Sequence, residues 1–197
     1  TQMNNKIILA SRSGVREKIL RKNGFECEVI PADIDEDSVK VALLGRGLNP
    51  TEISKSLAKL KSIKISNKKQ NKYVLGADSV IDFNGELISK PKDRNEAFST
   101  LKKINGKTHH LVSSVCISLN GVMIWHYTDA SSLTMKELSF DEIKIYLKGI
   151  KDKELYAYGV YQIEASGRFL FSKIEGDENT IMGLPIKPIK EYLNSTK

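Results

Sequence analysis

The chain has 197 residues, of which 40% are hydrophobic and 28% charged, enough for one domain, or two lobes sharing one core, with a sizeable apolar interior. No apolar run approaches the ~20 residues that span a bilayer, and no apolar signal segment opens the sequence, so we expect a cytoplasmic protein with no membrane partner. The formal charge of +7 is compatible with plain solubility and also with a polyanionic partner, either a triphosphate or a nucleic acid.

The predicted elements mix strand–helix units with hairpins. Pro50 opens a helix with Glu52 at the capping-box position, and Asn-Gly pairs predict tight hairpin turns, most clearly at Asn120 and Gly121. The predicted strands lie at 6–10, 25–31, 73–82, 86–89, 108–119, 122–135 and 168–176, and the predicted helices at 15–23, 50–65, 95–104, 139–149 and 185–194. This pattern indicates an α/β protein with a mixed sheet, in a single domain over residues 3–197.

The cysteines and histidines show no metal-ligand spacing. Cys27 and Cys116 lie in apolar, strand-like segments, so we expect buried, reduced thiols. His109, His110 and His126 form no cluster of the kind that holds zinc, which argues against such a site.

The segment 11–16 joins a buried strand to the start of a helix. Unpaired backbone N–H groups and the helix dipole favour an anion there. Ser13 is a natural N-cap, but Arg16 stands where a capping box would place Glu, and a cation in the first turn is locally unfavourable. A bound phosphate would compensate it; a solvent-facing arginine on a capped helix is the alternative.

Carboxylates occur in two places that suit a metal. Asp78 interrupts the apolar run 73–82, so if buried it must be paired, hydrogen-bonded or metal-bound. It could bind a hard cation, act as a general base on water, or cap a nearby turn. The acidic turn at 32–37 contains Glu36. It is either a solvated loop or part of a Mg²⁺ site, since that ion takes one or two carboxylates plus substrate phosphates.

Two lysines are candidates for binding a leaving pyrophosphate. Lys90 precedes Pro91, which stiffens the chain there, and Lys61 lies on the long basic helix. A triphosphate site needs such cations because charge builds on the leaving group. Each lysine taken alone is more often a surface residue.

In their order and spacing these segments resemble the Maf family of nucleoside triphosphate pyrophosphatases. The likeness runs from about residue 6 to 193. The matching segments are LASRSGVREKIL at 9–20, PADIDED at 31–37, LAKLK at 57–61, LGADSVIDFNGELISKP at 75–91, GKTHHLVSSV at 106–115 and YQIEASGRFLFSKIEGDENTIMGLPI at 161–186. They are similar to the family's Leu-Ala-Ser-x-Ser-Pro-Arg-Arg segment, Asp-Glu turn, Leu-Ala-x-x-Lys, Gly-Ala-Asp-Thr strand with Lys-Pro hairpin, Gly-x-Thr-His segment and Gly-Leu-Pro end.

The resemblance implies a role for each candidate and a fold similar to that of the inosine-triphosphate pyrophosphatases. That fold is a long mixed sheet flanked by helices, with two lobes around a central cleft, and members commonly dimerise. Asp78 would be the proton acceptor, and Asp78 and Glu36 would hold a divalent metal, Mg²⁺ or Mn²⁺. Lys61 and Lys90 would line the same region. The triphosphate loop would consist of Ser11, Ser13 and Arg16.

Two departures from the family pattern bear on the substrate. Gly14-Val15-Arg16 replaces Pro-Arg-Arg, so one loop arginine is missing. Glu164 falls where many members have a Gln that contacts the base, and Gln162 lies two residues before it. If this stretch is a strand, both side chains face the same way. A carboxylate would favour a donor-rich base edge such as guanine, so the chain resembles the branch of the family that acts on 7-methyl-GTP.

The resulting prediction is metal-dependent hydrolysis of a nucleoside triphosphate to the monophosphate and pyrophosphate, with Glu164 and Ser79 contacting the base. This would serve the house-cleaning of modified nucleotides. The alternatives are a dTTP/UTP pyrophosphatase of the same family and a nucleotide- or nucleic-acid-binding regulator of cell division without turnover. Aromatic residues make up 7% of the chain and are not interleaved with basic ones, which argues against nucleic acid as the partner.

Overall fold

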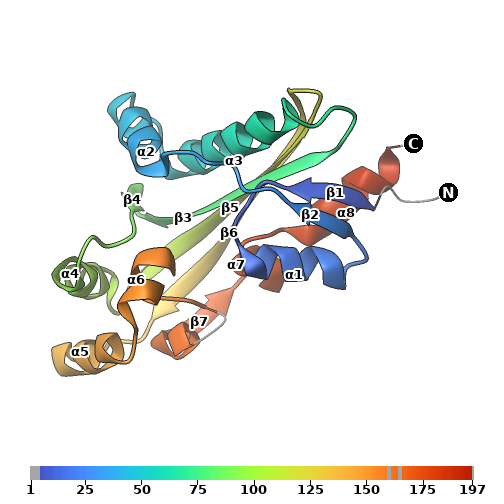
Figure 1. Ribbon diagram of the computed structural model, residues 1–197. Helices are drawn as coiled ribbons and strands as arrows, with labels where there is room; N and C mark the ends of the chain where they lie inside the picture. The colour runs from blue at the N-terminus through green and yellow to red at the C-terminus, as the bar shows by residue number, and fades with distance from the viewer. Residues whose placement is uncertain (1–4, 159–160, 164–165, 197) are drawn as a thin grey trace.

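The computed structural model describes residues 5–158, 161–163 and 166–196 of the chain. It is an α/β structure, as predicted, with a mixed seven-stranded sheet in this part of the chain (Figure 1). The strands are β1 Lys6–Leu9, β2 Glu26–Val29, β3 Val74–Phe83, β4 Glu86–Ile88, β5 Thr108–Leu119, β6 Val122–Met135 and β7 Phe171–Glu175. The helices are α1 Gly14–Lys22, α2 Glu36–Gly45, α3 Pro50–Ser66, α4 Arg94–Ile104, α5 Phe140–Lys148, α6 Asp152–Tyr158, α7 Glu178–Ile181 and α8 Ile186–Ser195, with a 3₁₀ turn at Ser166–Leu170.

The strand order leaves part of β3 open along one edge. The sheet runs β2-β1-β3-β5-β6-β7, and β4 pairs with β3 on the same side as β1. β1 pairs with β3 at residues 74–75, and β4 pairs with it at residues 81–83. Between them, residues 76–80 have β5 on one side and, within the described chain, no strand on the other. Asp78 and Ser79 lie in this gap.

The two largest apolar clusters lie toward opposite ends of the long strands. One cluster unites β1, β2, α1 and α8, and the other unites α4, α5, α6 and β7. Figure 1 shows these groups at opposite ends of β3, β5 and β6. Along β3, Ala77 belongs to the first cluster and Phe83 to the second. The gap in the sheet edge therefore lies where β3 passes from the first of these clusters to the second.

Helix α3 packs closely against β3, because Gly76 has no side chain between the strand and the helix. A Cβ atom on Gly76 would come within 2.1 Å of the Ala58 carbonyl oxygen and 2.8 Å of the Ser62 nitrogen. The hydroxyl of Ser62 donates to the Val74 carbonyl at 2.8 Å and so fixes the helix on the strand. This close approach brings the side chain of Lys61, one residue earlier on α3, to the open edge of β3.

We expect Gly76→Ala to lower the free energy of unfolding by about 1–3 kcal/mol or more, because backbone atoms of α3 must move away from the added methyl group. Lys61 should shift with the helix, so activity should fall as well. Gly45→Ala is the matched control, since Gly45 ends α2 with nothing within 4 Å of an added Cβ. Urea unfolding of the two variants measures the difference; equal stabilities would contradict this account of α3 packing.

Several elements differ from those predicted. The acidic turn at 32–37 leads into a helix that was not predicted: Asp35 caps α2 by accepting from the Ser38 nitrogen, and Glu36 is the first residue of α2. The last strand begins at Phe171 rather than at residue 168, because a 3₁₀ turn precedes it. Helices α6 and α7 were not predicted. Cys27 and Cys116 are buried and free, as predicted. None of the described helices is long and apolar enough to cross a membrane.

Candidate active site

A buried carboxylate, a lysine and a second carboxylate meet at the open edge of β3. The Nζ atom of Lys61 lies 3.3 Å from Asp78 Oδ1 and 2.5 Å from Glu36 Oε1, and it also donates to the Ala77 carbonyl at 3.3 Å. These side chains come from α3, β3 and α2, so the fold unites residues far apart in the sequence. Asp78 is only 5% exposed, and its Oδ2 atom has no hydrogen-bond partner among the described residues.

The two carboxylates differ in proton affinity. Burial raises the pKa of Asp78, and the charge of Glu36 acts in the same direction, while Lys61 and Lys40 oppose the rise. Burial also acts to raise the pKa of Glu36, yet that pKa is lowered overall. The lowering comes from the positive charges of Lys61, Lys40 and Lys90. Glu36 therefore stays ionised, whereas Asp78 is the better proton acceptor of the pair.

Arg16 is held at the same edge by serine hydroxyls and a carbonyl. Its Nη1 donates to Ser11 Oγ and its Nη2 to Ser79 Oγ, both at 3.1 Å, and its Nε donates to the Gly183 carbonyl at 2.9 Å. Ser13 caps α1, because its hydroxyl accepts from the Arg16 backbone nitrogen at 3.2 Å. The fixed guanidinium keeps further N–H groups for a ligand, since these bonds occupy three of its five donors.

The lysine and the arginine reach the open edge from opposite faces of the sheet. Asp78 and Ser79 are consecutive on β3, so their side chains point to opposite faces. Lys61 contacts the first and Arg16 the second. Arg16 nevertheless acts on the pKa of Asp78, which it lowers. Cations thus flank a buried carboxylate along a strand edge, an arrangement suited to a polyanion and a hard metal ion.

The structure brings most of the predicted site residues together. Asp78, Glu36 and Lys61 form one cluster. Arg16, Ser11 and Ser79 form a second cluster, next to Ser13, which caps α1. Lys90 is exposed, and its positive charge helps to lower the pKa of Glu36.

The described part of the base-contacting stretch is not a strand. Residues 161–163 lie outside any strand, and the Gln162 carbonyl accepts from the Gly167 nitrogen at 3.2 Å. The argument that alternate strand residues share a face therefore does not apply to Gln162. Glu164 lies outside the described residues.

Sequence reasoning missed Lys40 and Gly183. Lys40 lies one turn after Glu36 on α2 and acts on the pKa of both carboxylates. Its four-residue spacing would have indicated this role if a helix had been predicted there. Gly183 has a φ of +105°, which favours glycine, and its carbonyl binds Arg16. No motif in the sequence around Arg16 or Gly183 indicates that contact, because the two residues are 167 positions apart.

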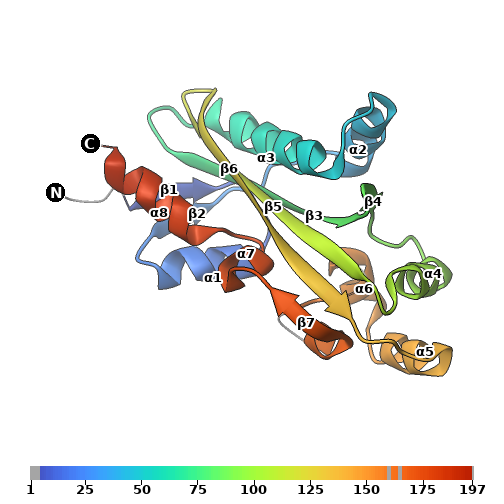
Figure 2. The same ribbon diagram turned by 180° about the vertical axis from the view of Figure 1, so that it is seen from behind.

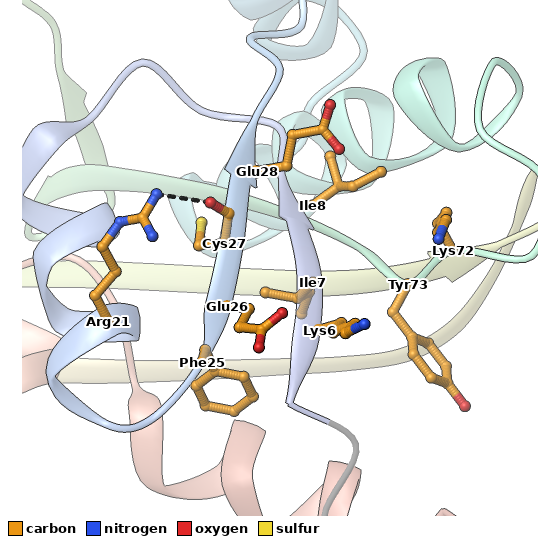
Figure 3. A pocket seen from close by; sticks show the side chains of 10 residues that line it. All are labelled: Lys6, Ile7, Ile8, Arg21, Phe25, Glu26, Cys27, Glu28, Lys72 and Tyr73. Carbon is orange, nitrogen blue, oxygen red and sulfur yellow. Dashed lines mark hydrogen bonds between the residues drawn. The ribbon is translucent and has the colours of Figure 1, made fainter.

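A cavity of about 470 Å³ lies elsewhere, around β1 and β2 (Figure 3). Arg21 on its rim donates to the Cys27 carbonyl at 2.7 Å. Its lining residues are Lys6, Ile7, Ile8, Arg21, Phe25, Glu26, Cys27, Glu28, Lys72 and Tyr73. None of the predicted site residues is among them, so the site at the β3 edge is distinct from this cavity.

The fold and the site define an α/β protein with carboxylates and cations gathered at the open edge of its sheet. The family model described as Maf-like protein matches residues 6–196. The chain belongs to the Maf family.

Relatives of known name are similar over almost their whole length. A nucleoside triphosphate pyrophosphatase of Pelagibacter ubique is 63% identical, over 99% of this chain and 100% of its own. A 7-methyl-GTP pyrophosphatase of Brucella abortus is 36% identical, over 99% and 98%. A HAM1 protein from Coxiella burnetii shows a weaker structural likeness, with a TM-score of 0.42 and 12% identity over 68% of this chain and 74% of that one.

Proposed function

We propose that this protein is a metal-dependent nucleoside triphosphate pyrophosphatase that hydrolyses the bond between the α- and β-phosphates. The observation that carries the proposal is the buried carboxylate of Asp78. Its Oδ1 is bound by Lys61, and its Oδ2 has no partner among the described residues. A buried carboxylate oxygen without a partner is costly unless a ligand satisfies it. The names of the Pelagibacter and Brucella relatives support the same reaction.

The carboxylates fit a hard divalent ion. Asp78 offers a free oxygen, and Glu36 stays ionised beside it. Among the described residues no three His, Cys, Asp or Glu side chains gather around one point. This suits Mg²⁺ or Mn²⁺, which is bound by one or two carboxylates together with substrate phosphates. When bound, such an ion neutralises charge on the phosphate oxygens in the transition state.

The residues of this chain supply the remaining steps. Asp78 accepts a proton from the attacking water, and the oxygen of that water forms a bond to the α-phosphorus. The bond between the α-phosphorus and the oxygen that bridges it to the β-phosphate breaks. Pyrophosphate leaves with the electron pair of this bond. Arg16 and Lys61 stabilise the charge on the leaving group from the two faces of the sheet, aided by Lys90 and Lys40.

We further propose 7-methyl-GTP, or a related modified nucleotide, as the substrate, which would give the enzyme a house-cleaning role. The Brucella relative bears that name. The carboxylate of Glu164 would accept hydrogen bonds from the donors on a guanine edge, and Gln162, two residues earlier in the sequence, is the second candidate for contacting the base. A positively charged methylated base would be attracted further.

The deciding experiment measures pyrophosphate release with Mg²⁺ or Mn²⁺ from GTP, 7-methyl-GTP, dTTP, UTP, CTP and ITP. We expect turnover, with 7-methyl-GTP preferred, and Glu164→Gln should reduce that preference. Preference for dTTP or UTP would preserve the reaction and refute this role of Glu164. Absence of turnover with every nucleotide would favour a regulator that binds nucleotides or nucleic acid.

We also propose a cytoplasmic homodimer. β6 pairs with β7 only from residue 132 onward, so among the described strands residues 122–131 form an open edge. Val122, Ile124 and Tyr127 on that edge are exposed apolar side chains. Long, apolar strand edges are templates for pairing with another chain. Light scattering after size exclusion gives the mass, and a monomer at tens of micromolar would refute the dimer.

A further inference from the structure

A row of polar side chains crosses three strands beneath helix α7. Ser79 of β3 is paired in register with Ser113 of β5, which is paired with Asp129 of β6. Ser79 and Ser113 share a hydrogen bond of 2.9 Å, and Ser113 Oγ lies 3.0 Å from the Thr180 carbonyl. Thr180 is fixed in turn, since its hydroxyl donates to Asp129 Oδ2 at 2.9 Å. Figure 2 shows α7 beside β5 and β6 on this face. The row ends at Arg16, which donates to Ser79.

The direction of each hydrogen bond in this row follows from the donor count. A carbonyl can only accept, so the hydroxyl proton of Ser113 goes to Thr180. Ser113 must then accept from Ser79, because a serine has one proton to donate. Ser79 has thereby used its own proton, and it meets Arg16 as an acceptor. Ser113 is fully buried, and Thr180 is 1% exposed, so water does not supply alternatives.

Ser11, on the other side of the guanidinium, also accepts from Arg16, but it keeps its own proton for a ligand. Its Oγ accepts from Arg16 Nη1 and from the Ser13 nitrogen at 3.2 Å. Its own proton has no acceptor among the described residues. Ser11 can therefore donate to a phosphate oxygen, whereas Ser79 offers only lone pairs, which repel such an oxygen.

We propose that Ser113 is a positioning residue, which acts through Ser79 to fix the guanidinium of Arg16 and to make Ser79 an acceptor toward any ligand. The phosphates then bind on the Ser11 side of Arg16, and the group that meets Ser79 is a hydrogen-bond donor, such as an N–H of the base. The inference deepens the proposed function and rests on it for the ligand. The fixing of Arg16 stands independently of that function.

The first test uses the protein without ligand. In ¹⁵N NMR the guanidinium signals of Arg16, assigned by their loss in Arg16→Gln, report rotation about the Nε–Cζ bond. We expect this rotation to quicken severalfold in Ser113→Ala, because Ser79 then has no acceptor that holds its hydroxyl. Ser118→Ala is the matched control: Ser118 is a buried serine on the same strand, bonded to Ser62 and not to this row. Unchanged rotation in Ser113→Ala would overturn the proposal.

The second test is a double-mutant cycle with the best nucleotide. Ser113→Ala should lower kcat/KM about three- to tenfold, as expected for one neutral hydrogen bond. In the Arg16→Gln background it should change kcat/KM by less than about twofold. Ser118→Ala should leave kcat/KM nearly unchanged. An equal loss in both backgrounds would show that Ser113 acts on general stability and refute the positioning role. If wild-type protein turns over no nucleotide, the proposed function fails while the NMR result still decides whether Ser113 fixes Arg16.

Discussion

Asp78→Asn should lower kcat by about 10²–10⁴-fold, the usual range for loss of a catalytic proton acceptor. The amide keeps the size of the carboxylate but cannot take a proton from water or hold a divalent ion by charge. Burial raises the pKa of Asp78, which makes it a stronger base than an exposed aspartate. Pyrophosphate release at saturating nucleotide measures the effect.

Asp82→Asn is the matched control for this variant. Asp82 lies on the same strand, and its side chain accepts from the Gly85 nitrogen at 2.7 Å, so it belongs to a turn and not to the site. We expect Asp82→Asn to keep near-normal kcat, and Asp78→Asn to retain a cooperative unfolding transition. If Asp78→Asn kept more than about a tenth of the wild-type kcat, Asp78 would not be the proton acceptor.

Lys61→Met should lower kcat/KM by about 10²–10³-fold, as is typical when one fixed donor to a developing charge is lost. It should also move the pH profile. Lys61 lowers the pKa of both Asp78 and Glu36, so its removal raises both values. Asp78 is then protonated, and inactive as a base, at pH values where the wild type is active. The acid limb of kcat/KM therefore shifts to higher pH.

The stability of Lys61→Met should depend on pH in a definite direction. Asp78 already has a raised pKa in the folded protein, and this variant raises it further. A raised carboxylate pKa leaves the folded state fully stable below about pH 4 and costs stability as pH rises through the folded-state pKa. Lys61→Met should therefore lose more stability at pH 8 than at pH 5, relative to the wild type. Lys59→Met, an exposed neighbour on α3, is the control, and a loss that did not vary with pH would contradict the coupling.

Local hydrogen bonds explain why many elements could be predicted. Asn120 and Gly121 both have positive φ, 51° and 80°, as the tight hairpin turn between β5 and β6 requires. The predicted capping box of α3 is present, with Asn49 and Glu52 bonded reciprocally. These contacts join residues within four positions of one another, so the local sequence contains them.

Helix α2 escaped prediction for an equally physical reason. None of its residues is buried, and its apolar residues lie at 39 and 41–44 as a short run that was not taken for a helix. Its start looked like an acidic loop because its cap, Asp35, and its first-turn acids are the residues that make up such a loop. The position of Glu36 beside Lys61 depends on this helix.

The sequence by itself determined the α/β class, most strands and helices, and several of the residues that meet at the open edge of β3. Only the tertiary structure decided how they meet. The strand order places β1 and β4 along different stretches of one edge of β3 and so leaves Asp78 and Ser79 open between them. The hydrogen bonds of the row from Arg16 to Thr180 also join residues that are 34 to 67 positions apart. Such contacts arise from packing between distant segments, for which neighbouring residues give no periodic or capping signal.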